Sequence, residues 1–226
     1  MTLRPKRSWI SARQREYLYD LLRWPAYLNY LRLKWVRPAS CWQAGDLWIN
    51  LGSGKAYVEG FINVDVNLYH RRDMWLDLRN PLPFRDGEAA GIFTSHVLEH
   101  FNLCEVQHIL NECHRILQVG GALRVSVPSL ALAIEAYQRH DLEFFHGEGR
   151  STGRRFVDHM LDKSNHRLMF DCSMMEELLL DARFGEVYQA AYRQSIFPGG
   201  ERLAALDDRP DISLYVEARK KQVMTS

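Results

Sequence analysis

The segment "TSHVLEHF", Thr94 to Phe101, holds residue types that could bind a metal ion or move a proton. Within it, "HVLEH" fits the pattern H-x-x-E-H, which is the zinc signature of one class of metallopeptidases. In that interpretation His96 and His100 would bind the zinc ion and Glu99 would act as the general base. The first question is whether the rest of the chain supports a zinc hydrolase.

The surrounding sequence argues against zinc chemistry. The preceding "IFTS" is typical of a strand, so His96 and His100 need not share one helical face, whereas a zinc hydrolase places such a pair in mid-helix with a further ligand. The four cysteines are far apart and form no CxxC pair, which argues against a cysteine-ligated zinc site and against a disulfide framework. We therefore expect no metal ion, and a reducing cytoplasm as the compartment.

A glycine-containing turn and two acidic residues indicate a nucleoside site instead. The turn "LGSG", Leu51–Gly54, follows a short apolar run, and its glycines let the backbone approach a ligand closely. Asp65 ends the next apolar run, "FINVDV", where a carboxylate can accept hydrogen bonds from both hydroxyls of a ribose. Asp77, at the end of a possible third strand, could accept a hydrogen bond from an exocyclic amine.

The spacing after the turn limits the kind of nucleoside. A dinucleotide fingerprint requires G-x-G-x-x-G at the start of a long helix. Here six residues separate Gly54 from Phe61, where the second apolar run begins, so a full helix does not fit. The P-loop signature is also absent. The sequence therefore favours a ligand without phosphates.

Apolar runs that alternate with helical patterns predict an open, mostly parallel α/β sheet. We expect a helix over residues 102–117, capped by Asn102 with Glu105 and stopped by the glycines at 120–121. A second helix over 173–184 is expected to start at a capping box of Ser173 and Glu176. Strands are expected over residues 46–54, 61–66, 74–78, 89–95, 122–128, 186–194 and 212–220.

Five sequence blocks in this order resemble the class I S-adenosylmethionine-dependent methyltransferases, in the broad group of methyltransferase type 11-like domains. The blocks are "INLGSG", "INVDV", "DLRNPLPFRDGEAAGIFTSHVLEHF", "ILNECHRILQVGGALRVSVP" and "NHRLMFDCSMMEELLLDARFGEV". They cover about residues 46–194, with 212–218 as a last strand. The resemblance implies a Rossmann-like seven-stranded sheet with an antiparallel last strand, and S-adenosyl-L-methionine as the cofactor.

The resemblance also implies site residues. Asn50 stands where the family often has Asp or Glu, and it can still accept a hydrogen bond from an amine. His96 and His166 are the candidate bases. The end of the fourth strand, "TSHV", lacks the Asn/Asp-Pro-Pro-aromatic tetrapeptide of amide and base N-methyltransferases, which favours an oxygen acceptor on a small molecule or glycan. The expected cofactor contacts are Asn50, Leu51, Gly52, Ser53, Gly54, Asp65, Val66, Asp77, Leu78 and Ser95.

The chain divides into a helical extension, residues 1–45, and a methyltransferase domain, residues 46–226, in which residues 129–172 form a substrate cap. Residues 1–40 carry a net charge of +7 and the remainder −6, and seven aromatic side chains lie among the basic ones. Pro25 is expected to kink or divide the helix of the extension. No apolar run is long enough to span a membrane, and no signal peptide is expected.

Several interpretations remain open for the basic extension and for the domain. The extension could pack on the domain or form a dimer contact, or it could lie peripherally on an anionic membrane at its inner face. It could also bind nucleic acid, which would make the chain a nucleic-acid methyltransferase, although no RNA-binding module is evident. For the domain, the alternative is a cofactor-binding protein without catalysis. The sequence does not predict the oligomeric state.

Overall fold

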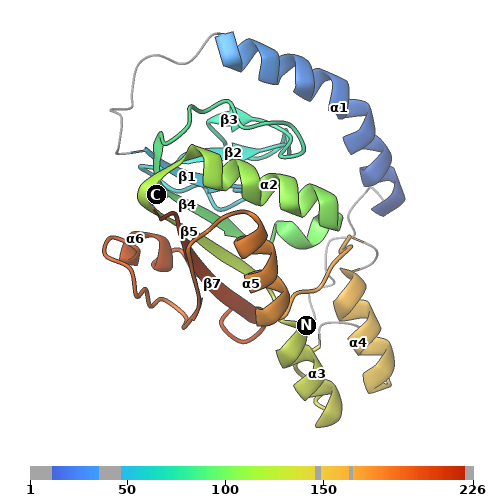
Figure 1. The fold of residues 1–226 in the computed structure, drawn as a ribbon. Coiled ribbons are helices and arrows are strands. Elements are labelled where there is room, and N and C mark those ends of the chain that lie inside the picture. The colour runs from blue at the N-terminus through green and yellow to red at the C-terminus, as the bar shows by residue number, and fades with distance from the viewer. Residues whose placement is uncertain (1–11, 36–46, 146–148, 163–164, 222–226) are drawn as a thin grey trace.

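The computed structural model describes residues 12–35, 47–145, 149–162 and 165–221, and these form a seven-stranded sheet with helices on both faces (Figure 1). The strand order is β3-β2-β1-β4-β5-β7-β6. β7 runs antiparallel to both of its neighbours, while the pairs among β1 to β5 are parallel. The predicted mostly parallel sheet with an antiparallel last strand is confirmed. The strands are β1 Leu47–Leu51, β2 Ile62–Asp65, β3 Met74–Trp75, β4 Ala89–Ser95, β5 Leu117–Pro128, β6 Glu186–Ala190 and β7 Ser213–Arg219.

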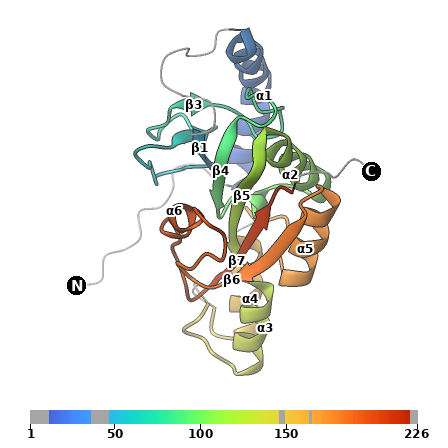
Figure 2. The same cartoon turned by 60° about the vertical axis from the view of Figure 1, so that its left-hand side comes forward.

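The helices divide unequally between the two faces of the sheet. α2 and α5 cover one face over the main hydrophobic core, and the short α6 lies on the other face, as Figure 2 shows. On the α6 side, Phe61, Phe93 and Phe197 form a smaller apolar cluster. The helices are α1 Ala12–Trp35, α2 Leu103–Ile116, α3 Leu130–Gln138, α4 Thr152–Leu161, α5 Cys172–Asp181 and α6 Glu201–Ala204, with a 3-10 helix η1 at Leu98–His100.

Some boundaries differ from the prediction. α2 has the expected Asn102 capping box, but it ends at Ile116 and β5 begins directly, so the glycines at 120–121 lie inside a strand. α5 is capped by Asp171, whose carboxylate accepts a hydrogen bond from the amide of Met174; the predicted cap at Ser173 was therefore wrong. An ionised aspartate accepts the amide hydrogen bond, and the Ser173 hydroxyl instead donates to Asp171.

α1 packs on the domain through one side of its second half. Ala26 and Tyr30 are buried, and the side-chain amide of Asn29 donates a 2.6 Å hydrogen bond to the carbonyl of Trp75 in β3. The helix runs through Pro25 without division, unlike the division that was considered. The domain boundary predicted at residue 45 lies outside the described residues. Among the described helices, none is long and apolar enough to cross a membrane.

The connection from β1 to β2 contains no helix, as its length predicted. The amides of Gly52 and Ser53 both donate to the carbonyl of Val64, at 2.8 and 3.0 Å, which folds the turn back onto β2. Gly52 has a φ of +67°, and a Cβ added there would lie 2.3 Å from a methyl group of Val97. Gly54 has a φ of +52°, but a Cβ there would meet only a carbonyl oxygen at 3.9 Å.

Two buried asparagines hold this connection in place of a helix. The side-chain amide of Asn50 donates to the carbonyl of Ala56 and to the side-chain oxygen of Asn63, at 2.9 and 3.1 Å. Asn63 in turn accepts from the amide of Val58 and donates to the carbonyls of Val58 and Phe61. Buried polar groups cost free energy unless they are hydrogen-bonded, so this set of contacts fixes the path of the loop.

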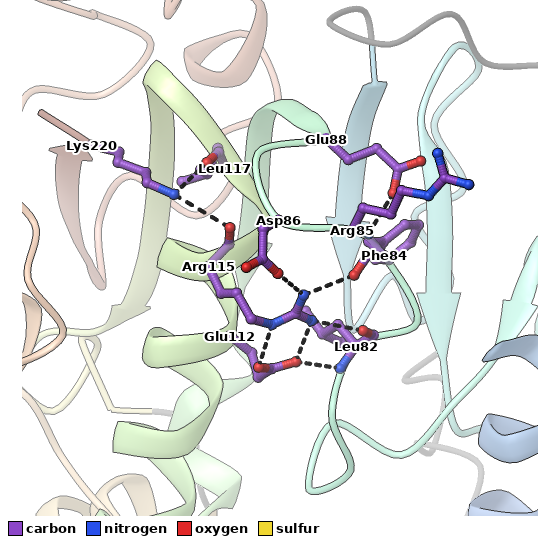
Figure 3. Close-up of polar contacts among 9 residues, drawn as sticks. All are labelled: Leu82, Phe84, Arg85, Asp86, Glu88, Glu112, Arg115, Leu117 and Lys220. Carbon is purple, nitrogen blue, oxygen red and sulfur yellow. Dashed lines mark hydrogen bonds and ion pairs between the residues drawn. The ribbon is translucent and has the colours of Figure 1, made fainter. Parts of the chain in front are cut away.

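An arginine network holds the segment between β3 and β4 against α2 (Figure 3). Arg115 donates to both carboxylate oxygens of Glu112 at 2.7 Å and to the carbonyls of Leu82 and Phe84. Burial alone would raise the pKa of Glu112, but the hydrogen bonds from Arg115 and from the amide of Leu82 lower it overall. The ionised carboxylate is therefore the form that stabilises this segment.

The lowered pKa of Glu112 predicts a stability difference that depends on pH. Because the folded pKa lies below the unfolded one, Glu112 stabilises the fold above the unfolded pKa, and this contribution is lost as the pH falls through the folded pKa. We expect Glu112→Gln to lower the free energy of unfolding by about 1–3 kcal/mol near pH 7. Urea denaturation from pH 3 to 8 should show that the difference in unfolding free energy between the wild type and Glu112→Gln shrinks as the pH falls. The control is Glu177→Gln, an exposed substitution on α5. If both variants differ from the wild type by the same amount at every pH, the prediction is contradicted.

The two turn glycines predict a graded effect on stability. Gly52→Ala should be strongly destabilising, by roughly 2 kcal/mol or more, because strain at positive φ adds to the overlap with Val97. Gly54→Ala should cost only about 1 kcal/mol, since its Cβ would make an ordinary contact and only the positive φ is strained. Thermal unfolding measures both, with Gly153→Ala in α4 as the control that should be neutral or stabilising. Equal losses at Gly52 and Gly54 would refute the packing argument.

Candidate functional site

The carboxylate of Asp65 joins the two loops at the carboxyl ends of β1 and β2. It accepts hydrogen bonds from the amide of Gly54 at 2.7 Å and from the amide of Asn67 at 2.5 Å. The side chain is 8% exposed, so it is nearly buried but still reaches the surface at this edge. Each carboxylate oxygen has a second lone pair, so hydroxyl donors of a ribose could still bind there.

The turn beside Asp65 is packed less tightly at Gly54 than at Gly52. A Cβ at Gly54 would meet one carbonyl oxygen at 3.9 Å, whereas at Gly52 it would overlap with Val97, so the second glycine is the one where a ligand could approach the backbone. A hydroxyl acceptor next to such a glycine fits the ribose of a nucleoside. The residues present are therefore compatible with S-adenosylmethionine at this edge.

Asn50 and Asp77 are partly engaged in structural contacts. Both hydrogens of the Asn50 side-chain amide are used within the loop, which leaves its carbonyl oxygen for an amine. Asp77 is buried and pairs with Arg79, whose guanidinium donates to both of its oxygens, at 2.6 to 3.0 Å. The role of Asp77 in binding an adenine amine stays a prediction. Leu51 and Leu78 are buried, Ser53 is nearly so, and Val66 is partly exposed.

Two further predicted residues, Ser95 and His96, lie at the end of β4 and directly after it. The Ser95 hydroxyl donates to Asp208 at 3.0 Å. His96 has a φ of +52°, which is uncommon for a residue other than glycine, and its Nε2 lies 2.9 Å from the hydroxyl of Ser213. Its Nδ1 lies 3.5 Å from a carboxylate oxygen of Glu99. The His96 ring is thus hydrogen-bonded through Nε2, and its Nδ1 faces Glu99; the next residue, Val97, packs against Gly52 of the glycine turn.

Glu99 is the centre of a histidine cluster. Its side chain is 1% exposed, and neither carboxylate oxygen receives a hydrogen bond from the described part of the chain. His166 Nε2 lies 4.0 Å from one of these oxygens, and the rings of His100 and His166 are 5.2 Å apart. η1 turns the side chain of Glu99 inward.

His166 reaches this cluster from the cap. The amides of Arg167 and Leu168 donate to the carbonyl of Glu99, at 2.7 and 3.2 Å, which ties the segment before α5 to η1. Burial lowers the pKa of His166, and the carboxylate of Glu99 partly offsets this effect. His96 and His166, the two candidate bases, therefore face the same carboxylate.

The other cap histidines lie elsewhere. The ring of His159 lies 5.4 Å from that of Phe144 and 5.5 Å from that of Phe145, inside the small apolar core that joins α3 to α4. His146 lies outside the described residues. α3 starts directly after β5, so the cap stands at the carboxyl edge of the sheet, where the glycine turn also lies (Figure 1).

Two important residues were missed by sequence reasoning. Nothing in the residue type of Asn63 indicates that it is buried. The available signal was its position inside an apolar strand, with Asn50 as a polar residue in the neighbouring strand. Arg124 is fully buried in β5 and pairs with Asp207 and Glu217, so it holds the loop after β6 against the sheet. A charged residue within the apolar run "ALRVSVP" was the available signal for such a pair.

Comparisons with known proteins bear on this geometry. Residues 67–125 match the family described as "Methyltransferase domain". The match spans β3, β4, η1, α2 and most of β5, and it ends before the cap. No curated protein matches the sequence significantly.

Several solved structures are similar to the chain. A S-adenosylmethionine-dependent methyltransferase from Archaeoglobus fulgidus has 13% identity and a TM-score of 0.50, covering 90% of this chain and 99% of that one. A possible histamine N-methyltransferase from Thermotoga maritima has 16% identity and a TM-score of 0.47, with coverage of 91% and 95%. A chain from the complex of the Haloferax volcanii Trm112 methyltransferase activator with a putative methyltransferase has 15% identity and a TM-score of 0.48, with coverage of 90% and 93%.

The likeness to the Archaeoglobus structure concerns the fold. The chain therefore has the fold of the class I S-adenosylmethionine-dependent methyltransferases, and its residues 67–125 match a methyltransferase domain.

Proposed function

We propose that the protein transfers a methyl group from S-adenosylmethionine to an oxygen atom of a small molecule or glycan. The observation that carries the cofactor part is the Asp65 carboxylate, which is held by the amides of Gly54 and Asn67 beside the glycine turn. In this proposal Asp65 accepts the ribose hydroxyls, and the backbone from Asn50 to Gly54 lies along the methionine part. Val66, Asp77 and Leu78 surround the adenine.

The chain's own residues supply position and a proton acceptor. The cofactor provides a methyl group on a sulfonium sulfur; the acceptor oxygen forms the new bond to carbon, the carbon–sulfur pair returns to sulfur, and the acceptor proton goes to a base. Holding the acceptor in line with the methyl group accounts for much of the rate in such a displacement. Ser95 and His96, at the end of β4, lie beside the turn where the methyl group is proposed to be.

His96 is the first candidate for the base, and His166 is the second. The Nε2 of His96 lies 2.9 Å from the Ser213 hydroxyl and its Nδ1 faces Glu99 at 3.5 Å, so its ring has a defined orientation. An oxygen acceptor needs such a base when it is a hydroxyl. The convergence of two histidines on Glu99 supports a hydroxyl over an amide nitrogen as the acceptor. The cap, with its own aromatic core, would cover the acceptor.

A second proposal concerns contact with a membrane. On α1, Leu21, Trp24 and Leu28 recur at helical spacing, and they are 56%, 73% and 61% exposed. They lie opposite Ala26 and Tyr30, which pack on the domain, so the apolar stripe points away from it. An exposed apolar stripe in a basic segment favours the surface of an anionic bilayer over nucleic acid.

Cofactor binding tests the first proposal. Asp65→Asn should weaken S-adenosylmethionine binding by roughly 10- to 100-fold, because one charge-assisted acceptor of about 1.5–3 kcal/mol is lost. Calorimetry on the wild type, Asp65→Asn and the exposed control Asp181→Asn measures this. If Asp65→Asn binds the cofactor as tightly as the wild type does, Asp65 is not the ribose acceptor. If the wild type does not bind S-adenosylmethionine, both the proposed methyl transfer and the alternative of a non-catalytic cofactor-binding protein are wrong.

Product analysis tests the acceptor. Protein incubated with methyl-labelled cofactor and either hydroxylated metabolites, glycans or RNA should label the first two classes only. The label should resist mild base, as methyl ethers do and methyl esters do not. Labelled RNA that is lost when residues 1–40 are removed would support the nucleic-acid alternative instead.

Vesicle sedimentation tests the α1 stripe. The wild type should co-sediment with anionic vesicles and much less with neutral ones, and the double change Trp24→Ser and Leu28→Ser should reduce binding several-fold. Tyr69→Ser, at an 84% exposed tyrosine outside α1, is the matched control. If both variants bind as the wild type does, the stripe does not contact the bilayer.

A further inference from the structure

The carboxylate of Glu99 is buried and receives no hydrogen bond from the described residues; the ring nitrogens of His96 and His166 lie 3.5 and 4.0 Å from one of its oxygens. Removing an ionised carboxylate from water costs several kcal/mol unless hydrogen bonds or opposite charges replace the water. The other buried acids have such partners: Asp207 and Glu217 pair with Arg124. For Glu99, both oxygens are buried, and the described residues give neither one a hydrogen bond.

The groups around Glu99 are metal ligands by type and by distance. One carboxylate oxygen of Glu99 and one ring nitrogen each of His100 and His166 all lie within 4.8 Å of one another. Two imidazoles and one carboxylate form a ligand set that binds zinc and other first-row divalent ions. Among the described residues, no other group of His, Cys, Asp and Glu side chains meets this criterion.

His100 is held as a metal-binding histidine is commonly held. Its Nδ1 lies 3.0 Å from the carbonyl of Asn165, so this nitrogen carries the proton and donates. The lone pair is then on Nε2. A backbone carbonyl that fixes the tautomer of a ligating histidine is a recurrent second partner in metal sites. Asn165 and His166 are adjacent in the chain, so one short segment of the cap supplies both the ligand and this orienting contact.

The backbone around the cluster already brings the ligands together. Glu99 and His100 come from η1, and His166 comes from the segment that donates two amide hydrogen bonds to the carbonyl of Glu99. Tetrahedral ligands at about 2.1 Å from zinc lie about 3.4 Å apart. The 4.0 Å separation between Glu99 and His166 therefore needs only a small side-chain rotation to reach this spacing.

We propose that Glu99, His100 and His166 bind one divalent transition-metal ion, in a site that joins the end of β4 to the cap. This assignment differs from the metallopeptidase pattern, in which His96 and His100 are the ligands and Glu99 is the base. Here Glu99 is a ligand, His96 lies beside it, and His166 replaces His96. It also replaces the expectation of a protein without a metal ion, and it gives His166 the role of a ligand rather than a base.

The site would also define the acceptor more closely, a step that rests on the proposed methyl transfer. Three protein ligands leave at least one coordination position open. A hydroxyl oxygen in that position would lose its proton more easily, and its orientation would be fixed. The proton released would pass to a base such as His96. Acceptors with a metal-binding hydroxyl, such as polyols, sugars and phenols, fit this arrangement.

Metal binding by the full-length chain tests the site without any acceptor. The background is Cys104→Ser, which removes an exposed thiol that could bind zinc adventitiously. After treatment with a chelator and its removal, calorimetry with Zn²⁺ and separately with Mn²⁺ should show one site per chain. Glu99→Gln and His166→Asn should each weaken binding at least tenfold, and the exposed control His140→Asn should not. Equal binding in all variants, or none in the parent, would overturn the proposal.

Thermal unfolding keeps the test informative if a variant folds poorly. The parent protein should gain stability with increasing Zn²⁺, since a ligand of the native state raises the unfolding temperature by mass action. Glu99→Gln should show no such gain, and without metal it should be at least as stable as the parent, because it removes an uncompensated buried charge. Loss of stability without metal would instead assign Glu99 to a pair with a protonated histidine and contradict the metal site.

Cofactor binding separates this proposal from the proposed function. S-adenosylmethionine should bind the chelator-treated parent and Glu99→Gln alike, because neither Asp65 nor the glycine turn contacts the cluster in any described interaction. A protein that binds the cofactor and no metal would refute the metal site alone. A protein that binds metal and no cofactor would refute the proposed methyl transfer alone.

Discussion

The buried pair of Asn50 and Asn63 is the interaction on which the candidate site depends. In a sheet of this kind a helix usually connects the first two strands and stabilises the turn. Here the connection is too short for a helix, and two amide side chains satisfy the loop's backbone groups instead. Because each asparagine makes more than one of these bonds, removing either side chain would leave several donors and acceptors unpaired at once.

This constraint extends to the cofactor edge through adjacent residues. Asn63 is two residues before Asp65, so the register of β2 that the amide pair fixes also fixes where the carboxylate stands. Asp65 then joins the glycine turn to the loop after β2 through two backbone amides. The position of the proposed ribose acceptor is thus set by the loop's own hydrogen bonds and is ready before any ligand arrives.

The sequence predicted those features that depend on local pattern. Continuous apolar runs located β1 and β4 closely, and the short spacing before Phe61 excluded a helix. The glycine turn and Asp65 followed from the same local reasoning. Contacts between distant segments could not be predicted in this way: Arg124 and Asp207 are 83 residues apart, and an arginine in an apolar strand does not name its partner.

The members of the histidine cluster also could not be predicted from local pattern alone. The local pattern "HVLEH" suggested a metal site with the wrong ligands, because spacing alone does not show that η1 turns Glu99 inward or that the cap returns beside it. The cap prediction, residues 129–172, concerned where an acceptor would bind, and the structure adds that one of its histidines reaches the end of β4.

The cap is attached to the sheet in a way that bears on how such proteins diversify. α3 and α4 share a small aromatic core of their own, separate from the main core. The segment that returns from them is joined to η1 through the backbone carbonyl of Glu99, a contact that any residues other than proline at positions 167 and 168 would preserve. The surfaces of α3 and α4 can therefore change in sequence with little effect on the sheet. New acceptors could be acquired by exchanging this module while the cofactor edge stays as it is.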